Sequence, residues 1–500
     1  MNIKKFLLSD NSYKVYLVTA ILFGIWFRLY GLDIQSFWFD ELGTAAVASY
    51  PKLTSIIGYC LMLDVHPPLY HIFTYYWVKM FDNSEILFRL PSAIAGIITI
   101  FLMYFGVKKL FNKYIATSAT ILIALSGSAV YYSQEARSYS ILLLFSTILT
   151  LLWLDILGKI RESELQVGKL AIYGIMSIVI SYLHYFGVAL IFFQLIYLIF
   201  TALLFKNNFR KVFLLSFIIA LFFMPWLLYH FIYIKDKTGG NFWIANQGIV
   251  FFMEFLNFVF NKYLIGLIFI PFLINLKSFS KIFLDYKKWL KLDSATLSLS
   301  YLSFFPILIF FLISVHTPIL IPRYLIILLP SIYLLIAILI SLNPGFKEIK
   351  GNIYIFIISL LGIIAFLSPI NGNGYKFYYD LYKQNWRSAS NYIISNLADN
   401  SIILVNKFPP TYSYYFDKFN KDKKSLMIRS LRDPDMRYFN IREIYDKAFF
   451  AVEVELDKPL EEQLEKDCKV YKKIPFAGGL FVYECRFNNK TLRNLHQSQE

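Results

Sequence analysis

The hydrophobic positions of this chain fall into long, uninterrupted runs that short polar segments separate. Most runs have about 18 residues or more, which is enough for a helix to cross the hydrocarbon core of a bilayer. Such runs lie near residues 15–34, 86–107, 114–132, 139–157, 249–276 and 353–370. Five others end at the polar segments SYLHYFG, KNNFRK, YIKDKTGGNFW, HTPILIPRY and NPGFKEIKG. The pattern predicts an all-α polytopic membrane bundle with about 11 transmembrane helices.

The pattern changes after the segment NGNG at 371–374. The stretch YDLYKQNWRSASNYIISNL has the spacing of an amphipathic helix. Short strands are predicted for SIILVNK, FFAVEVEL, KVYKKIPF and GLFVYECRF. We therefore expect a membrane domain over residues 1–370, which contains a first outer loop at 35–85, and an extracytoplasmic α/β domain over 371–500. The α/β domain is interpreted as a lid or partner-binding module without catalytic residues.

Composition supports a membrane protein. Hydrophobic residues make up 57% of the chain and charged residues 16%, whereas a soluble domain has about a quarter charged. The net charge of +16 falls mostly in short loops before residue 371, which is typical of the positive-inside rule rather than of nucleic-acid binding. Positive loops begin at Lys108, Lys159, Lys206, Lys277 and Lys347. This predicts a multi-pass protein of the cell (inner) membrane, with a cytoplasmic N-terminus and an extracytoplasmic C-terminal domain.

The three cysteines are Cys60, Cys468 and Cys485, and none has the spacing of a metal site. If the C-terminal domain lies outside the cytoplasm, Cys468 and Cys485 can form a disulfide. The sequence alone does not decide whether this disulfide forms. The first apolar run has no small-residue cleavage site before it, so we interpret it as an uncleaved first helix.

Acidic residues gather in the first outer loop, where SFWFDELG places Asp40 beside Glu41. Acids next to membrane-spanning sequence are costly unless they face water or take part in chemistry. Such a carboxylate can deprotonate an acceptor group or hold a divalent metal. The alternative is a solvated pair without a chemical role. On a short helix the two side chains would point in different directions, so they need not share one role.

The segment DVHPPLYH adds Asp64 and His66. The double proline restricts His66 to extended conformations, which would place it on the same face as Asp64. The pair is a tentative metal site, and His66 is also a candidate for binding phosphate. A capping or interfacial role is the alternative. His71 is interpreted as structural.

Other ionisable residues are predicted on the same outer side. Arginine suits bidentate phosphate binding, although buried pairing and snorkelling to the interface are alternatives. Lysines in the loop YIKDKTGGNFW are candidates for mobile phosphate contacts, or plain solvated charges. The phosphate-binding candidates are Arg137, Arg323, Lys235 and Lys237, and further candidates are Glu135, His184 and Arg89.

Acids and cations on one membrane face suit a lipid-linked phosphate donor. The cations would stabilise the leaving phosphate, and an acid would act as general base for the acceptor. The main alternative is a transporter or lipid flippase of a cell-envelope glycan pathway. Transporters tend to place ionisable groups near the bilayer midplane, often within internal repeats, and we find no repeat. A non-catalytic assembly partner is a third possibility.

Several of these motifs together resemble the GT-C glycosyltransferases of family 39, which include the protein O-mannosyltransferases and the bacterial aminoarabinose lipid A transferases. The resemblance rests on WFDE, DVHPPLYH, FRLPSAIAG, QEARSY and PRY, over about residues 15–340. It implies a GT-C helical bundle with juxtamembrane helices in its first outer loop. It also implies a polyprenyl-phosphate-linked sugar donor and transfer that inverts the anomeric centre.

The resemblance also assigns roles. Asp40 matches the catalytic base, with Glu41 beside it, and His66 matches a position associated with donor phosphate or metal. Arg137 and Arg323 carry over as phosphate contacts. A divalent metal ion is the one cofactor considered. The MIR-like repeats of eukaryotic mannosyltransferases are not seen in the sequence, so the acceptor is left open among lipid, glycan and protein.

Overall fold

The structure is a computed structural model that divides into two compact units, each built from separate stretches of the chain. It describes residues 12–62, 64, 66–238, 244, 248–260, 294–342, 349–367, 381, 383–406, 409–422, 425–431, 441–442, 444–453 and 455–487. Unit 1 comprises Met1–Tyr30, Lys52–Phe73 and Leu87–Gly374, and unit 2 comprises Gly31–Pro51, Thr74–Ile86 and Tyr375–Glu500. The first loop is therefore shared between the two units.

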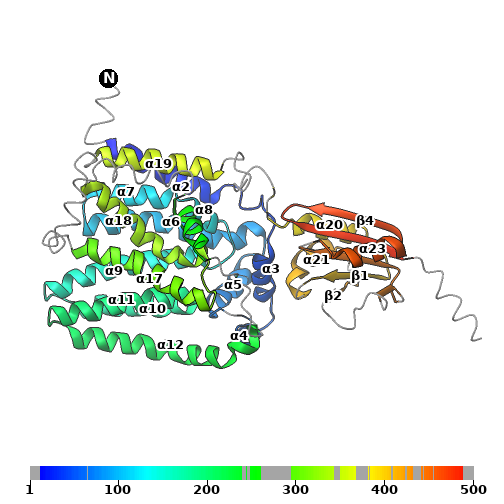
Figure 1. Cartoon of the computed structure of the whole chain (residues 1–500), viewed down its shortest axis with the longest axis horizontal. Helices are drawn as coiled ribbons and strands as arrows, with labels where there is room; N and C mark the ends of the chain where they lie inside the picture. Colours follow the sequence, from blue (N-terminus) through cyan, green and yellow to red (C-terminus); the bar gives the residue numbers. More distant parts are fainter. Residues whose placement is uncertain are drawn as a thin grey trace, which may run out of the picture. The chain divides into compact units, whose positions relative to one another are not determined.

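Unit 1 is a bundle of helices (Figure 1). Its elements are α2 (Ser12–Leu29), α4 (Leu53–Met62), α6 (Glu85–Leu110), α7 (Lys113–Ala124), α8 (Gly127–Ser133), α9 (Tyr139–Arg161), α10 (Val167–Leu183), α11 (Tyr185–Leu204), α12 (Phe209–Thr238), α13 (Val250–Phe260), α17 (Ser294–His316), η1 (Pro322–Leu328), α18 (Leu329–Leu342) and α19 (Ile349–Leu367). Helix α5 (Leu69–Met80) runs from unit 1 into unit 2. One large apolar core joins the bundle helices.

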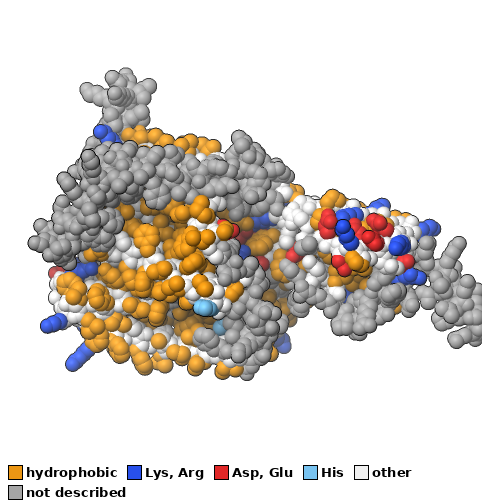
Figure 2. Space-filling view, viewed as in Figure 1, with side chains coloured by type: hydrophobic (Ala, Val, Ile, Leu, Met, Phe, Trp, Pro, Cys, Tyr) orange, Lys and Arg blue, Asp and Glu red, His pale blue; other side chains and the backbone are white. Residues whose placement is uncertain are grey.

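The surface of the bundle is apolar as well as its interior. Figure 2 shows hydrophobic side chains over much of its visible face. Along α12, Phe217, Leu221 and Phe222 are each 58% exposed. An apolar surface this continuous is not stable against water, and it fits contact with lipid acyl chains.

Seven described helices are long and apolar enough to cross a membrane, and the bent pair α7 and α8 makes an eighth. Each of the eleven predicted spans overlaps a described helix; shorter ones include α10 and α13. The predicted span at 249–276 coincides with α13 and then continues into residues outside the described part. The predicted fold class, a polytopic helical bundle with a small α/β domain, is confirmed.

The span predicted at 114–132 is bent by 56° between α7 and α8. The Ser126 hydroxyl accepts a hydrogen bond from Ala129 N–H at 3.2 Å, which starts α8 as a new helix. The buried Arg28 guanidinium donates to the carbonyls of Ile123 and Ala124 at 3.0 and 2.9 Å. A cation suits these carbonyls because they are the negative end of the α7 dipole.

The described residues of unit 2 form a five-stranded sheet in the order β2-β1-β3-β5-β4. Its strands are β1 (Ser401–Val405), β2 (Met427–Ser430), β3 (Lys447–Val452), β4 (Cys468–Phe476) and β5 (Leu480–Phe487). Strands β2, β1 and β3 are parallel, whereas β5 runs antiparallel to β3 and β4. The other elements are α3 (Phe39–Ala48), α20 (Trp386–Ser395), η2 (Pro409–Tyr412), α21 (Ser413–Phe419) and α23 (Lys458–Asp467). All four predicted strands are present, and β2 was not predicted.

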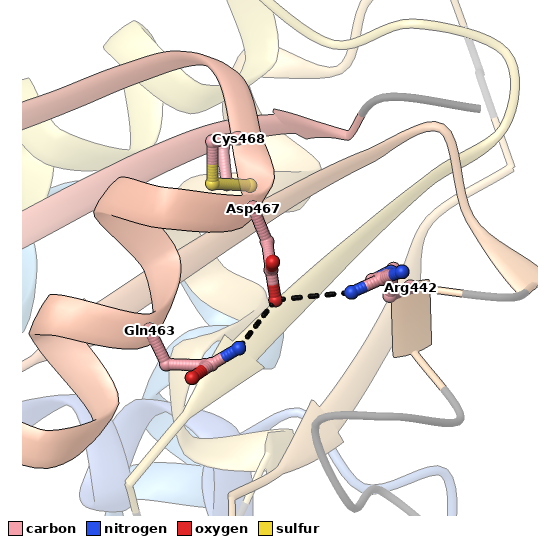
Figure 3. Close-up of a disulfide and its surroundings, with 5 residues drawn as sticks. Arg442, Gln463, Asp467 and Cys468 are labelled. Carbon is pink, nitrogen blue, oxygen red and sulfur yellow. Dashed lines mark hydrogen bonds and ion pairs between the residues drawn. A yellow bond between two sulfur atoms is a disulfide. The ribbon is translucent and has the colours of Figure 1, made fainter. Parts of the chain in front are cut away.

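A disulfide joins Cys468 to Cys485, on the neighbouring strands β4 and β5. Beside it, Asp467 accepts a hydrogen bond from Gln463 at 2.8 Å and pairs with Arg442 at 3.1 Å (Figure 3). These contacts connect the end of α23 to Arg442, which precedes β3. The bond that the sequence left open is therefore formed in the structure.

Candidate active site

The first group of predicted site residues lies on α3, in unit 2. Trp38 has extended backbone before the helix, and its N–H lies 3.5 Å from Oε2 of Glu41, three residues on. That return contact is half of a capping box and favours a helix starting at Phe39. The side chain of Glu41 is fully buried, while Asp40 is partly exposed. The two carboxylates therefore have different environments, and Asp40 is the more accessible.

Glu41 has a buried cation near it. The Nζ atom of Lys383 lies 3.8 Å from Glu41 Oε2, and the Lys383 side chain is 4% exposed. The same ammonium lies over the Trp38 ring, 5.8 Å from its centroid. A buried charge requires such compensation. The pair therefore places a cation beside the buried end of α3. The sequence gives no sign of Lys383 as a partner because it lies more than 300 residues away.

The second group lies in unit 1, where Asp64 joins two histidines. Asp64 Oδ1 lies 2.9 Å from His66 Nδ1, and Asp64 Oδ2 lies 2.6 Å from His71 Nε2. The backbone N–H of His66 also donates to Asp64 Oδ1 at 3.1 Å. Burial by itself would raise the pKa of Asp64, but the charges and hydrogen bonds of His66 and His71 outweigh it and hold the pKa well below its usual value. Asp64 thus fixes the orientation of the His66 ring.

His184, the single residue between α10 and α11, connects this pair to the arginines. Its ring centroid lies 5.3 Å from that of His66 and 5.2 Å from that of Tyr324. The Arg323 guanidinium lies 5.7 Å from the centroid of the Tyr324 ring. Burial lowers the pKa of His184 well below its usual value, and His66, Arg137 and Arg323 lower it further. The structure therefore gathers these predicted residues around one histidine.

The tautomer of His184 follows from its backbone contact. Nδ1 accepts a hydrogen bond from Phe186 N–H at 3.1 Å, so the neutral ring carries its proton on Nε2. Nε2 is buried and has no hydrogen-bond partner within the described part of the chain. His184 thus presents an N–H donor that feels the positive charges of Arg137 and Arg323. Such an arrangement suits a phosphate oxygen.

The contacts that the structure shows at Asp64 and His66, the tentative metal site, are hydrogen bonds. Both oxygens of Asp64 accept hydrogen bonds from histidines. Within the residues that the structure describes, no three His, Cys, Asp or Glu side chains form a group that could hold a metal. Asp64 and His66 are therefore better described as a hydrogen-bonded pair.

The other predicted residues are placed as follows. Glu135 is fully buried in the turn between α8 and α9, and Arg89 is buried within α6. Lys235 and Lys237 were predicted in a loop, but their backbone belongs to the last turns of α12; their side chains lie outside the described part. The reason is length, because 30 residues extend about 45 Å, further than the roughly 30 Å core of a bilayer.

The chain is similar to one known protein family and to several solved structures. Residues 65–229 match the model of the dolichyl-phosphate-mannose-protein mannosyltransferase family. No curated protein matches the chain. ArnT from Cupriavidus metallidurans bound to undecaprenyl phosphate is similar over 95% of this chain and 98% of its own, with 12% identity and a TM-score of 0.61.

Two further structures are similar. ArnT in the apo state covers 94% of this chain and 98% of its own, with 11% identity and a TM-score of 0.60. The Archaeoglobus fulgidus oligosaccharyltransferase in the apo form covers 89% of this chain and 70% of its own, with 11% identity and a TM-score of 0.51. At such low identities, the structural similarity shows a shared fold alone.

The fold and the family match together make the chain similar to membrane glycosyltransferases of the GT-C type. Within that class the chain resembles the protein mannosyltransferases and ArnT, so the similarity predicted from its motifs is confirmed.

Proposed function

We propose that the protein transfers a sugar from a polyprenyl-phosphate donor to a lipid, glycan or protein acceptor. The observation that carries the proposal is the cluster around His184, with Arg137, Arg323 and His66. Its groups suit a phosphate, and the similar ArnT structure was obtained with undecaprenyl phosphate bound. The shared fold favours this function over a transporter or flippase.

The chemistry follows from the charge that develops during transfer. The donor phosphate carries one negative charge as a diester and a second when its bond to the anomeric carbon breaks. Arginines and an N–H donor placed beforehand stabilise that second charge more than the first, which lowers the barrier. Arg137 and Arg323 supply the cations, and His184 supplies the neutral donor.

Asp40 is proposed as the general base that takes the proton from the acceptor. The resemblance to the WFDE motif suggests this role, and the partial exposure of Asp40 supports it against the buried Glu41. Glu41 then contributes by holding α3 rather than by contacting the acceptor. Lys235, Lys237, Glu135 and Arg89 have no role in this mechanism.

We propose further that Asp64 orients His66 instead of holding a metal. A chelator titration of transfer activity tests this directly, and we expect no loss. If activity disappeared and Mg²⁺ or Mn²⁺ restored it, the reaction would require a metal and this assignment of Asp64 would be wrong.

The proposed orientation has unit 2 on the extracytoplasmic side and the N-terminus in the cytoplasm. Positive loops support it, and so does the disulfide, because such bonds persist in oxidising compartments. A reporter that is active only outside the cytoplasm, fused after Gly374, should be active. If the fusion were inactive, the proposed orientation would be wrong, and unit 2 would lie in the cytoplasm.

The decisive experiment incubates the purified chain with polyprenyl-phosphate sugars and candidate acceptors. We expect transfer by the wild type and a loss of at least about 100-fold in kcat for Asp40→Asn. The matched control is Asp33→Asn, which removes an exposed carboxylate from the same loop and should leave kcat unchanged. Asp40→Asn at the wild-type rate would disprove the role of Asp40, and no transfer from any such donor would disprove the function.

A further inference from the structure

The first turn of α3 is capped by a residue from the C-terminal part of the chain. The backbone N–H of Phe39 donates to the side-chain oxygen Oε1 of Gln384 at 3.0 Å, across 345 residues. The first N–H groups of a helix have no partner inside the helix. Gln384 supplies one from another segment, immediately before Asp40.

Residues 383–387 and Tyr415 together hold the residues that lead into α3. Three hydrogen bonds do this: Lys383 N–H to Gln35 Oε1 at 3.3 Å, Arg387 N–H to Ser36 Oγ at 3.1 Å, and Phe37 N–H to the Tyr415 hydroxyl at 2.8 Å. The backbone path into Asp40 is thus fixed by contacts with residues 383–387 and 415.

An ion pair secures this arrangement. Arg387 donates to Glu85 Oε1 from Nε at 3.0 Å and from Nη2 at 2.8 Å. The Tyr415 hydroxyl donates to the same oxygen. Glu85 is buried, and buried charge-assisted bonds of this kind are strong and directional. The segment that carries Gln384 is therefore held in one place.

The turn between β4 and β5 closes on Gln384 from the sheet. Asn385 N–H donates to the Ala477 carbonyl at 3.0 Å. Gly478 has φ +74°, and a Cβ atom there would lie 2.3 Å from the backbone nitrogen of Gln384. No side chain fits at that distance. Glycine at this position lets the turn contact the backbone of residues 383 and 384.

We propose that Gln384 is a positioning residue for Asp40, so that the C-terminal domain contributes to catalysis by fixing α3. This adds a positioning role to the lid or partner-binding role expected for that domain, and it rests on the proposed function. Gln384 acts through the backbone, and it has no contact with substrate in this proposal. A small displacement of a reacting group is enough to lower a rate by about 100-fold.

The test compares Gln384→Met, which loses the acceptor oxygen, with Gln384→Glu, which keeps it. A carboxylate is favourable at a helix N-terminus, so Gln384→Glu should retain most of the activity. For Gln384→Met we expect kcat to fall about 10- to 100-fold while the donor KM is unchanged. Gln166→Met, at an exposed residue of unit 1, is the matched control and should behave as wild type.

Hydrogen exchange of the Phe39 amide provides a readout that needs no activity. It should be faster in Gln384→Met and in Gly478→Ala, and unchanged in Gln384→Glu. Wild-type kcat or unchanged exchange in Gln384→Met would overturn the proposal. If wild type showed no transfer activity but Phe39 exchange changed in the variants as expected, the proposed function would be disproved. The hydrogen bond from Phe39 to Gln384 would still be supported.

Discussion

Replacing Lys383 by methionine tests the buried ion pair under α3. Methionine keeps most of the length of the side chain and removes the charge. Glu41 is fully buried and Lys383 is 4% exposed, with 3.8 Å between Nζ and Oε2. Water therefore cannot readily replace the lost ammonium, and the carboxylate of Glu41 would remain buried after the loss of this cation.

The size of the effect follows from that geometry. Two unit charges about 4 Å apart attract by about 4 kcal/mol at an effective dielectric constant near 20. Measured costs for removing one partner of a buried pair are about 3–5 kcal/mol. We expect Lys383→Met to destabilise unit 2 by this amount. The double variant Glu41→Gln with Lys383→Met should cost less than the sum of the single variants, because neither charge remains.

Thermal unfolding of the purified full chain in detergent measures these stability losses. It is followed for wild type, the two single variants and the double variant. Lys458→Met removes an exposed lysine from the same unit and should leave Tm unchanged. If Lys383→Met is as stable as wild type, or if the two single losses simply add, the pair does not stabilise α3 and the argument is refuted.

Three other predictions concern separate parts of the structure. The pKa of Asp64 is lowered in the folded state, so the carboxylate's stabilising contribution is complete above the unfolded pKa of about 3.9 and is lost as the pH falls below that value. The Tm difference between wild type and Asp64→Asn should therefore shrink in acid. A widening difference would contradict this prediction. Reducing the disulfide, which bridges 17 residues, should cost about 3 kcal/mol; Tm should fall with dithiothreitol in wild type but not in the Cys468→Ser, Cys485→Ser double variant. His184→Phe should raise the donor KM about tenfold or more, the usual value of a hydrogen bond to a charged group, whereas His184→Gln keeps an N–H donor and should be less affected; equal KM values would exclude the proposed contact.

Much of unit 1 could be predicted from the sequence because the bilayer imposes a simple pattern. A span needs a long apolar run, and such runs are visible without knowledge of the fold. The bend at Ser126 was not predicted, since a serine within an apolar run gives no sign that its hydroxyl will cap a second helix. Strand β2 was missed because it has four residues and no continuous buried face.

The candidate site was predictable where one motif supplies the residue. Asp64, His66 and His184 came from short local signals, and the structure adds the hydrogen bonds that orient them. Lys383 and Gln384 could not be found in this way. Their partners lie in the first loop, and a single sequence does not reveal which distant segments meet.

The origin of unit 2 in three separate stretches has a consequence for biosynthesis. Phe39 leaves the ribosome 345 residues before Gln384, which caps it. At about 5–20 residues per second, α3 is without that cap for roughly 20–70 s. During this interval the bundle inserts while Asp40 is not yet held in its final geometry. The proposed positioning of Asp40 by Gln384 is therefore established only when translation is nearly complete.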